Sequence, residues 1–425
     1  MPLALVLTAV APLPGWAETP VGVLHAPRVA SHPAPPLHYI GSVALYPDGG
    51  VLAAGWTILV EDPAVSTLDL LLSGSFGGVS VSGSGVVSAA SAPDAGLGPD
   101  IRRHSIVLTP PAPDTPRIVK LAYSGPLDGG GLPINTVDPE KIELTVDSFW
   151  FPFDARFDTP ITADVQLRVD GDWTALGVGT VSRTPKGYRL EQSRPGLDVA
   201  TVLLKTTQTR RVDGITVHDA RRDPGSNVPE LFTAIRDCAG WLNALAGPAG
   251  PLPPTTVVVT NRADGGWSRG SLIALTDIEN EDEEALRQFV CHELAHHWSR
   301  ANAGGPDNWI NEGVADHLAN MALRDAMGEA VYRARLDRYS EALTSAGLPP
   351  LWTPGTTRKP SHLGLYRAAP LALADLEDRM GRAPFRSLMR VVMTEEVGDT
   401  DRFLALVERE AGKEMRDWFE ARLAR

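Results

Sequence analysis

The sequence has very little cysteine and no long apolar run. Only Cys238 and Cys291 occur in 425 residues, which excludes a disulfide framework and a Cys-x-x-Cys metal site. The two thiols could pair in an oxidising compartment, but the favoured interpretation is two separate, buried small side chains. No segment reaches the about 18 to 20 continuous apolar residues of a membrane-spanning helix.

Basic residues are also scarce relative to acidic ones. The chain has 39 Lys and Arg against 52 Asp and Glu, a formal net charge of −13, and no basic stripe. Because binding to a phosphate backbone requires clustered Lys and Arg, this composition argues against a nucleic-acid partner. The hydrophobic fraction of 43% and the charged fraction of 21% are those of a soluble globular protein, and the length predicts two or three domains.

The N-terminus resembles a secretory signal peptide. Leu3 to Pro12 is apolar, and Gly15-Trp16-Ala17 followed by Glu18 resembles a small-residue cleavage site. This pattern predicts a signal peptide over residues 1–17 and an exported protein, periplasmic or secreted. No Lys or Arg precedes the apolar stretch, so a buried first strand is the alternative interpretation.

The chain changes character near residue 205. Before it, short alternating apolar runs are separated by Gly, Pro, Asp and Ser, as in residues 42–45, 68–72, 105–108 and 165–169. Runs of this length and period are strands, and the frequent turn residues predict an antiparallel sandwich or saddle over residues 18–205.

Helical periodicity dominates residues 206–425. A first helix is expected over Val228–Leu245, followed by strands over Thr255–Thr260 and Ser271–Thr276. Further helices are expected over 281–303, 311–328, 329–346, 366–381, 383–396 and 399–424, with a Pro-rich loop over Pro349–Pro360. Asn280 can cap the helix that begins near residue 281. The second domain is therefore expected to combine a small sheet with helices.

A metal site is suggested by His292-Glu293-Leu294-Ala295-His296. The two histidines are four residues apart, so both imidazoles project from one helix face. Their nitrogens can then reach one zinc ion at about 2.0–2.1 Å. Glu293 lies beside them, where a general base for the metal-activated water is needed. The alternative is a helix with two ordinary half-buried histidines.

Three later residues favour the metal site. Glu312 can serve as the third ligand, and two His with one Glu leave the open fourth position that catalytic zinc requires. Asp316 follows four residues later and can accept the second ring N–H of a ligand histidine. Tyr366 can donate a hydrogen bond to the oxyanion of a tetrahedral intermediate, although by itself it would be assigned to packing.

Together these segments resemble the gluzincin aminopeptidase family, the group of alanyl aminopeptidase or aminopeptidase N. That family carries H-E-x-x-H followed by W-x-N-E-G-x-A, as His292–His296 and Trp309–Ala315 do here. Its catalytic tyrosine opens a Y-x-x-[GA] helix, as Tyr366 to Ala369 does, and Phe149 to Pro152 resembles its W-[YF]-P signature. The resemblance covers most of residues 35–425. It implies a β saddle followed by a thermolysin-like zinc-peptidase domain, with Glu312 as the third ligand.

The sequence departs from this family at its G-x-M-E-N segment. The matching residues read Gly265-Gly266-Trp267-Ser268-Arg269, so Ser268 replaces the glutamate that holds the substrate's free amine. Arg269 would repel that amine, which predicts weak or absent aminopeptidase activity. We expect these residues to bind a blocked or internal peptide, or an acidic group through Arg269. The alternative is that Arg269 points to solvent and another acid binds the amine. Ser271–Thr276 could pair with an extended peptide as an added strand.

The leading interpretation is therefore a metallopeptidase with one zinc ion per chain and a peptide or protein substrate. A non-catalytic, chaperone-like peptide-binding module on the same scaffold is the main alternative, although binding alone needs no general base. Hydrolysis of an ester or epoxide is a third.

Overall fold

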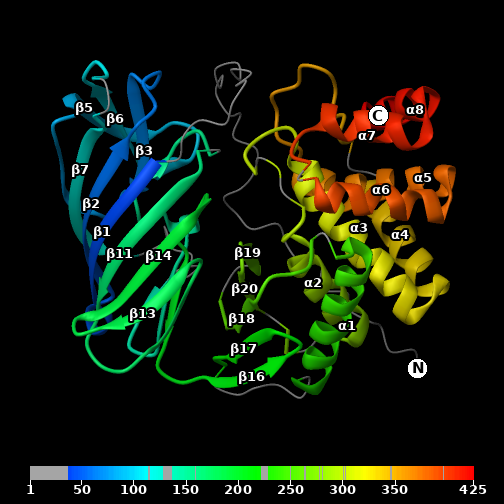
Figure 1. Ribbon diagram of the computed structural model, residues 1–425, viewed down its shortest axis with the longest axis horizontal. Helices are drawn as coiled ribbons and strands as arrows, with labels where there is room; N and C mark the ends of the chain where they lie inside the picture. Colours follow the sequence, from blue (N-terminus) through cyan, green and yellow to red (C-terminus); the bar gives the residue numbers. More distant parts are fainter. Residues whose placement is uncertain are drawn as a thin grey trace, which may run out of the picture.

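The computed structural model describes residues 37–425, apart from 113–114, 128–135, 158, 222–227, 249, 263–264, 277, 280, 300, 302, 345–346 and 396. The predicted signal peptide therefore lies outside the described residues. Figure 1 shows a β-rich first part and a helical second part, with a small sheet between them. This arrangement confirms the predicted fold class, a β domain followed by a mostly helical domain.

A seven-stranded sheet forms the framework of the first domain. In spatial order its strands are β13 (Thr180–Thr184), β14 (Gly187–Gly196), β11 (Ile161–Arg168), β1 (Leu37–Tyr46), β2 (Val51–Val60), β7 (Arg117–Pro126) and β4 (Gly77–Ser82). All neighbours are antiparallel except β1 and β11, which are parallel. Every second side chain of β2 is buried, so one face of the sheet packs into the core.

Two four-stranded sheets complete this domain. One contains β10 (Phe153–Asp154), β3 (Thr67–Ser73), β6 (Gly98–Leu108) and β5 (Val86–Asp94). The other contains β12 (Thr174–Gly177), β15 (Thr201–Leu204), β9 (Lys141–Leu144) and β8 (Thr136–Val137). The alternating apolar runs at residues 42–45, 68–72, 105–108 and 165–169 overlap β1, β3, β6 and β11. The period-two pattern therefore located these strands correctly.

Aromatic side chains fill the core of the first domain. The Trp150 ring lies 5.7 Å from that of Trp56 and 5.5 Å from that of Phe151. The Tyr39 hydroxyl donates to the Pro152 carbonyl at 2.8 Å. The Phe149–Pro152 segment is therefore part of this core and not of the metal centre.

A five-stranded sheet begins the second domain. Its order is β16 (Gln208–Val212), β17 (Ile215–Asp219), β18 (Thr255–Val259), β20 (Leu272–Leu275) and β19 (Trp267–Arg269). β18 and β20 match the two predicted strands. Because β20 pairs with β18 on one side and β19 on the other, it offers no free edge. The expectation that Ser271–Thr276 pairs with a peptide was wrong, and the edge strand next to it is β19.

Eight α-helices and one π-helical turn are found among the described residues. They are α1 (Val228–Ala246), α2 (Glu283–Ala295), α3 (Asn308–Met327), α4 (Glu329–Leu343), η3 (Gly364–Ala368, π-helical), α5 (Ala369–Met380), α6 (Arg382–Thr394), α7 (Thr400–Ala411) and α8 (Lys413–Leu423). None of them is long and apolar enough to cross a membrane.

Two predicted helices were too long. The helix predicted over 281–303 ends at Ala295, and the one over 399–424 is broken at Gly412, whose φ of 87° interrupts the helical backbone. The side chain of Asp282 caps α2 by accepting from the Ala285 N–H at 2.8 Å. The predicted cap, Asn280, lies outside the described residues.

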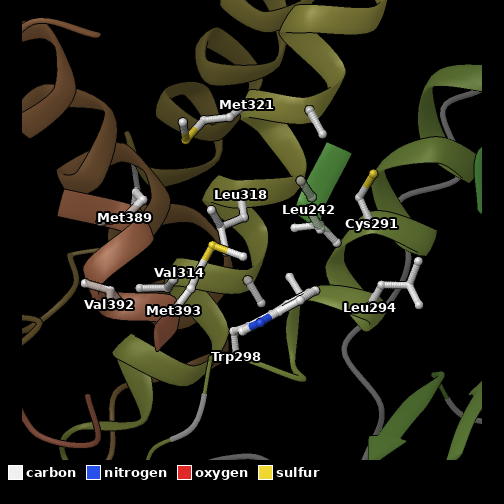
Figure 2. Close-up of a cluster of buried hydrophobic side chains, with 14 of the residues drawn as sticks. Leu242, Cys291, Leu294, Trp298, Val314, Leu318, Met321, Met389, Val392 and Met393 are labelled. Carbon is white, nitrogen blue, oxygen red and sulfur yellow. The ribbon is translucent and has the colours of Figure 1, made fainter. Parts of the chain in front are cut away.

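An apolar core fixes α2 against its neighbours. Figure 2 shows side chains from α1, α2, α3 and α6 meeting in this core, among them Leu242, Leu294, Leu318 and Met389. A disulfide between Cys238 of α1 and Cys291 of α2 adds a covalent link. The favoured interpretation of two separate thiols was therefore wrong. The core and the disulfide together set the position of the helix that carries His292.

Candidate metal centre

Three of the predicted site residues lie at the end of α2. The rings of His292 and His296 lie 4.7 Å apart, edge to face at 89°, and their Nε2 atoms are 3.1 Å apart. Both ring nitrogens therefore converge on one point. Glu293, between them in sequence, is buried, and its Oε2 atom has no hydrogen-bond partner among the described residues.

Glu312 completes this cluster from the first turns of α3, which packs against α2. Its Oε2 atom lies 3.5 Å from Nε2 of His292 and 3.5 Å from Nε2 of His296, and it is buried without a hydrogen-bond partner in the described part of the chain. Four-coordinate zinc with bonds of about 2.0–2.1 Å separates its ligands by about 3.3 Å. The three atoms fit such an ion, and no other set of metal-ligating side chains with this spacing occurs in the described residues.

The electrostatics of the cluster favour a positive charge at its centre. Burial opposes a charge on His292, but the facing carboxylates of Asp316 and Glu312 outweigh burial and raise its pKa to about 10. Burial likewise opposes the charge of Glu312, but His296 and His292 lower its pKa to about 2. Burial lowers the pKa of His296 to about 4, which leaves a neutral imidazole at pH 7. Burial raises the pKa of Glu293 to about 7, which suits a group that exchanges a proton.

Asp316 supports His292 from one turn further along α3. Its Oδ1 atom lies 3.7 Å from Nδ1 of His292. The carboxylate accepts hydrogen bonds from Gln288 at 2.7 Å, Tyr339 at 2.8 Å and Asn320 at 3.1 Å. So many partners fix the carboxylate, which in turn orients the imidazole. No sequence pattern pointed to Tyr339, but Gln288 could have been found, since it lies four residues before His292 on the same helix face.

Tyr366 reaches the cluster from the π-helical turn η3. Its ring lies 5.7 Å from that of His292, with the planes tilted by 34°. Burial, reinforced by the charge of Glu312, raises the pKa of Tyr366 well above its usual value, so the phenol stays protonated. The structure thus brings Tyr366 to the metal ligands, while its catalytic role stays a prediction.

The segment that differs from the family's G-x-M-E-N pattern, residues 265–269, includes the edge strand β19. Gly265 and Gly266 precede the strand, and Ser268 lies half-buried within it. A Cβ atom on Gly266 would lie only 2.6 Å from the Phe289 ring and 2.7 Å from the Ala274 carbonyl oxygen, so glycine is needed here. β19 is the outermost strand of its sheet and lies close to α2, the helix of the metal centre.

Arg269 is held by the first domain. Its Nε atom donates to Asp198 at 3.2 Å, and Nη2 forms an ion pair with Asp147 at 3.4 Å. The expectation that Arg269 binds an acidic substrate group is not supported, because two carboxylates of the protein already bind it. The alternative, in which it points to solvent, is also wrong. Burial is the largest effect on the pKa of Glu293 and raises it. The positive charge of Arg269 acts in the opposite direction and lowers that pKa in part.

No protein-family model and no curated protein matches the sequence, whereas solved structures do. The M1 zinc metallopeptidase of Deinococcus radiodurans aligns with a TM-score of 0.68 and 18% identity, over 92% of this chain and 94% of that one. Native leukotriene A4 hydrolase of Saccharomyces cerevisiae aligns with a TM-score of 0.68 and 14% identity, over 93% of this chain and 69% of that one. The chain has the fold of the M1 zinc metallopeptidases.

Within this M1-type fold, a buried charge cluster joins the two domains beside the metal centre. Arg262 forms ion pairs with Glu143 at 3.4 Å and with Asp147 at 3.3 Å, and the Trp267 indole donates to Glu143 at 3.0 Å. Each acid comes from the first domain and each donor from the second. The sequence could not reveal this cluster, because its members are scattered and share no motif.

Proposed function

We propose that this chain is a zinc-dependent peptide hydrolase. The convergence of His292, His296 and Glu312 at the spacing of tetrahedral ligands carries the proposal. Glu293 adds a buried carboxylate with an unbonded oxygen, for which a structural role offers no explanation. The M1-type fold supports the same conclusion.

Zinc bound at this site would supply a Lewis acid and lower the pKa of a water molecule toward about 7. Glu293 accepts a proton on its free carboxylate oxygen and delivers it to the nitrogen of the leaving group. Tyr366, which keeps its proton, donates a hydrogen bond to the oxygen on which negative charge develops. Asp316 holds His292 in one tautomer and orientation.

We further propose that an extended peptide binds along β19. An edge strand presents unpaired backbone groups with which a peptide can pair. A point mutant of the Deinococcus radiodurans protein, which shares this fold, has been solved with the substrate Tyr-Ser-Ala bound, so peptide binding occurs on a related scaffold.

The peptide that fits best lacks a free amine near Arg269. Ser268 provides no carboxylate for an amine. Among the described residues, the three acids at this end of the site, Glu143, Asp147 and Asp198, already form ion pairs or hydrogen bonds with arginines. A protonated amine would therefore be desolvated without a free partner, at a cost that an acetylated or internal residue avoids.

Matched peptides with free and acetylated N-termini test this function, with cleavage positions read by mass spectrometry. We expect the wild type to cut the acetylated peptide at least as fast as the free one. Glu293→Gln should retain zinc and lose turnover. Full activity of Glu293→Gln would refute the mechanism. Zinc-dependent release of N-terminal residues from free peptides alone would refute the substrate preference.

We also propose that the protein is exported. The buried Cys238–Cys291 disulfide supports this, because such bonds form and persist in oxidising compartments. Mass spectrometry of unreduced peptides from the native source should find the two cysteines joined. Finding only free thiols would count against export.

A further inference from the structure

The buried residue Tyr339 of α4 lies between two segments that build the metal centre. Figure 1 shows α4 beside α3, the helix of Glu312 and Asp316. Helix α4 also packs against η3, the turn that carries Tyr366. Tyr339 is only 3% exposed, and it contacts the first segment with its hydroxyl and the second with its ring. One side chain can therefore act on both segments.

Arg335 fixes the direction of the hydrogen bond that the Tyr339 hydroxyl donates. The Arg335 Nε atom donates to the hydroxyl oxygen at 2.9 Å, while its Nη1 atom donates to Glu284 at 3.2 Å. Because a guanidinium has no acceptor, the hydroxyl accepts from Arg335 and gives its own proton to Oδ2 of Asp316 at 2.8 Å. Burial raises the pKa of Tyr339, and the charge of Asp316 raises it further, so the phenol remains a donor at neutral pH.

This hydrogen bond leaves the other oxygen of Asp316 facing the metal ligand. Oδ2 also accepts from Asn320 at 3.1 Å, whereas Oδ1 accepts from Gln288 at 2.7 Å and lies 3.7 Å from Nδ1 of His292. Asn320 and Gln288 lie on the two helices that carry the ligands, and Tyr339 adds a donor from a third helix. Tyr339 thus helps to fix the rotation of the carboxylate that orients His292.

The ring of Tyr339 supports the segment of Tyr366 through Arg367. The Arg367 guanidinium lies over the Tyr339 ring, 4.7 Å from its centre, which is within the range of a cation–π contact. From this position its Nη1 atom donates to the Tyr366 carbonyl oxygen at 2.7 Å, in the middle of η3. The ring therefore anchors an arginine that binds the backbone of the proposed oxyanion donor.

We propose that Tyr339 is a positioning residue with two separable effects: its hydroxyl supports zinc binding by His292, and its ring holds Tyr366 in place. The inference rests on the proposed function, in which His292 is a metal ligand and Tyr366 a hydrogen-bond donor. Neither effect requires Tyr339 to touch zinc or substrate. Substitutions that remove the hydroxyl and the ring contact separately should therefore weaken different properties of the protein.

Tyr339→Phe tests the hydroxyl, because it keeps the ring. We expect its zinc affinity, measured by chelator competition, to fall about tenfold. Losing a group that orients a metal ligand lowers affinity by about 10- to 100-fold, and Asp316 keeps its donors from Asn320 and Gln288. This measurement needs no turnover.

Tyr332→Phe is the matched control. Tyr332 lies on the same helix, is 1% exposed, and donates its hydroxyl to the buried carboxylate of Glu377 at 3.4 Å. An arginine also lies over its ring, since Arg324 is 4.6 Å from the ring centre. This tyrosine thus has the same kind of surroundings without a contact to Asp316, and its substitution should leave zinc affinity unchanged.

Arg367→Met tests the ring contact, because it keeps the length of the side chain and removes the charge and the donors. We expect kcat at saturating zinc to fall about tenfold with KM little changed, since a displaced Tyr366 stabilises the oxyanion less well. Zinc affinity should stay at the wild-type value. Hydrogen–deuterium exchange of residues 364–368, read by mass spectrometry, should be faster in Arg367→Met and in Tyr339→Leu but not in Tyr339→Phe.

The two effects can be refuted separately. Unchanged zinc affinity in Tyr339→Phe, or an equal loss in Tyr332→Phe, would overturn the role of the hydroxyl. Wild-type exchange of residues 364–368 in Arg367→Met would overturn the role of the ring. If zinc affinity and exchange respond as expected but the wild type cuts no peptide, the hydrolase proposal fails and the positioning role of Tyr339 stands.

Discussion

Asp198 should make the stability of the protein depend on pH between about 4 and about 6. The residue is only 2% exposed, and its side chain accepts from the Val146 N–H at 3.0 Å and from Arg269 at 3.2 Å. Its Oδ1 atom is buried and has no hydrogen-bond partner among the described residues. Burial outweighs the attraction of Arg269 and raises the pKa of Asp198 from 3.8 to about 6.

The sign of the effect follows from this direction. Because the folded protein holds the proton more tightly than the unfolded chain, the contribution to stability is complete below about pH 4. It is lost as the pH rises from about 4 to about 6, because over this range the Asp198 carboxyl loses its proton in the unfolded chain but keeps it in the folded protein. A shift of about two pH units corresponds to about 3 kcal/mol.

Chemical denaturation of the wild type and of Asp198→Asn from pH 4 to pH 8 measures this effect. An asparagine does not titrate, so the variant should gain about 3 kcal/mol relative to the wild type across this range. Asp172→Asn is the control, because the Asp172 side chain is 99% exposed and has no burial to relieve. A stability difference between wild type and Asp198→Asn that does not change with pH would refute the reasoning.

Three further changes test other parts of the account. Asp316→Asn should weaken zinc binding about 10- to 100-fold by loosening His292, as chelator competition would show, and unchanged affinity would remove the supporting role. Tyr366→Phe should lower kcat about 100-fold with KM little changed in steady-state assays, whereas an unaffected kcat would exclude the phenol from the chemistry. Replacing Cys238 and Cys291 together with Ala should lower the unfolding free energy by about 4 kcal/mol, because their bond spans a sequence separation of 53. Calorimetry would check this, and an equally stable variant would contradict it.

Local patterns in the sequence were enough to predict much of the fold. Period-two runs found β1, β3, β6 and β11, and helical periodicity found α1 to α6, because each depends on residues close in sequence. The spacing of His292 and His296 is also a local pattern, because four residues along one helix place both side chains on the same face. Boundaries were less reliable. The break between α7 and α8 needs the backbone conformation of Gly412, which a single glycine in a helical pattern does not prove.

Tertiary contacts could not be predicted in the same way. Arg269 looked like a free cation because its partners, Asp147 and Asp198, lie in another domain. The disulfide likewise joins two helices whose packing the sequence does not state. β19 is only three residues long and has no periodic signal, although it forms the edge beside the site. Glu312 was a candidate third ligand from its residue type and position, the family resemblance implied the same residue, and the structure brings it to the two histidines.

Metal analysis of the purified protein tests the central claim most directly. The account predicts about one zinc ion per chain in the wild type and loss of that zinc in a variant with His296 and Glu312 both replaced by Ala. A wild-type protein that binds no zinc, or a double variant that keeps it, would contradict a metal centre built from His292, His296 and Glu312.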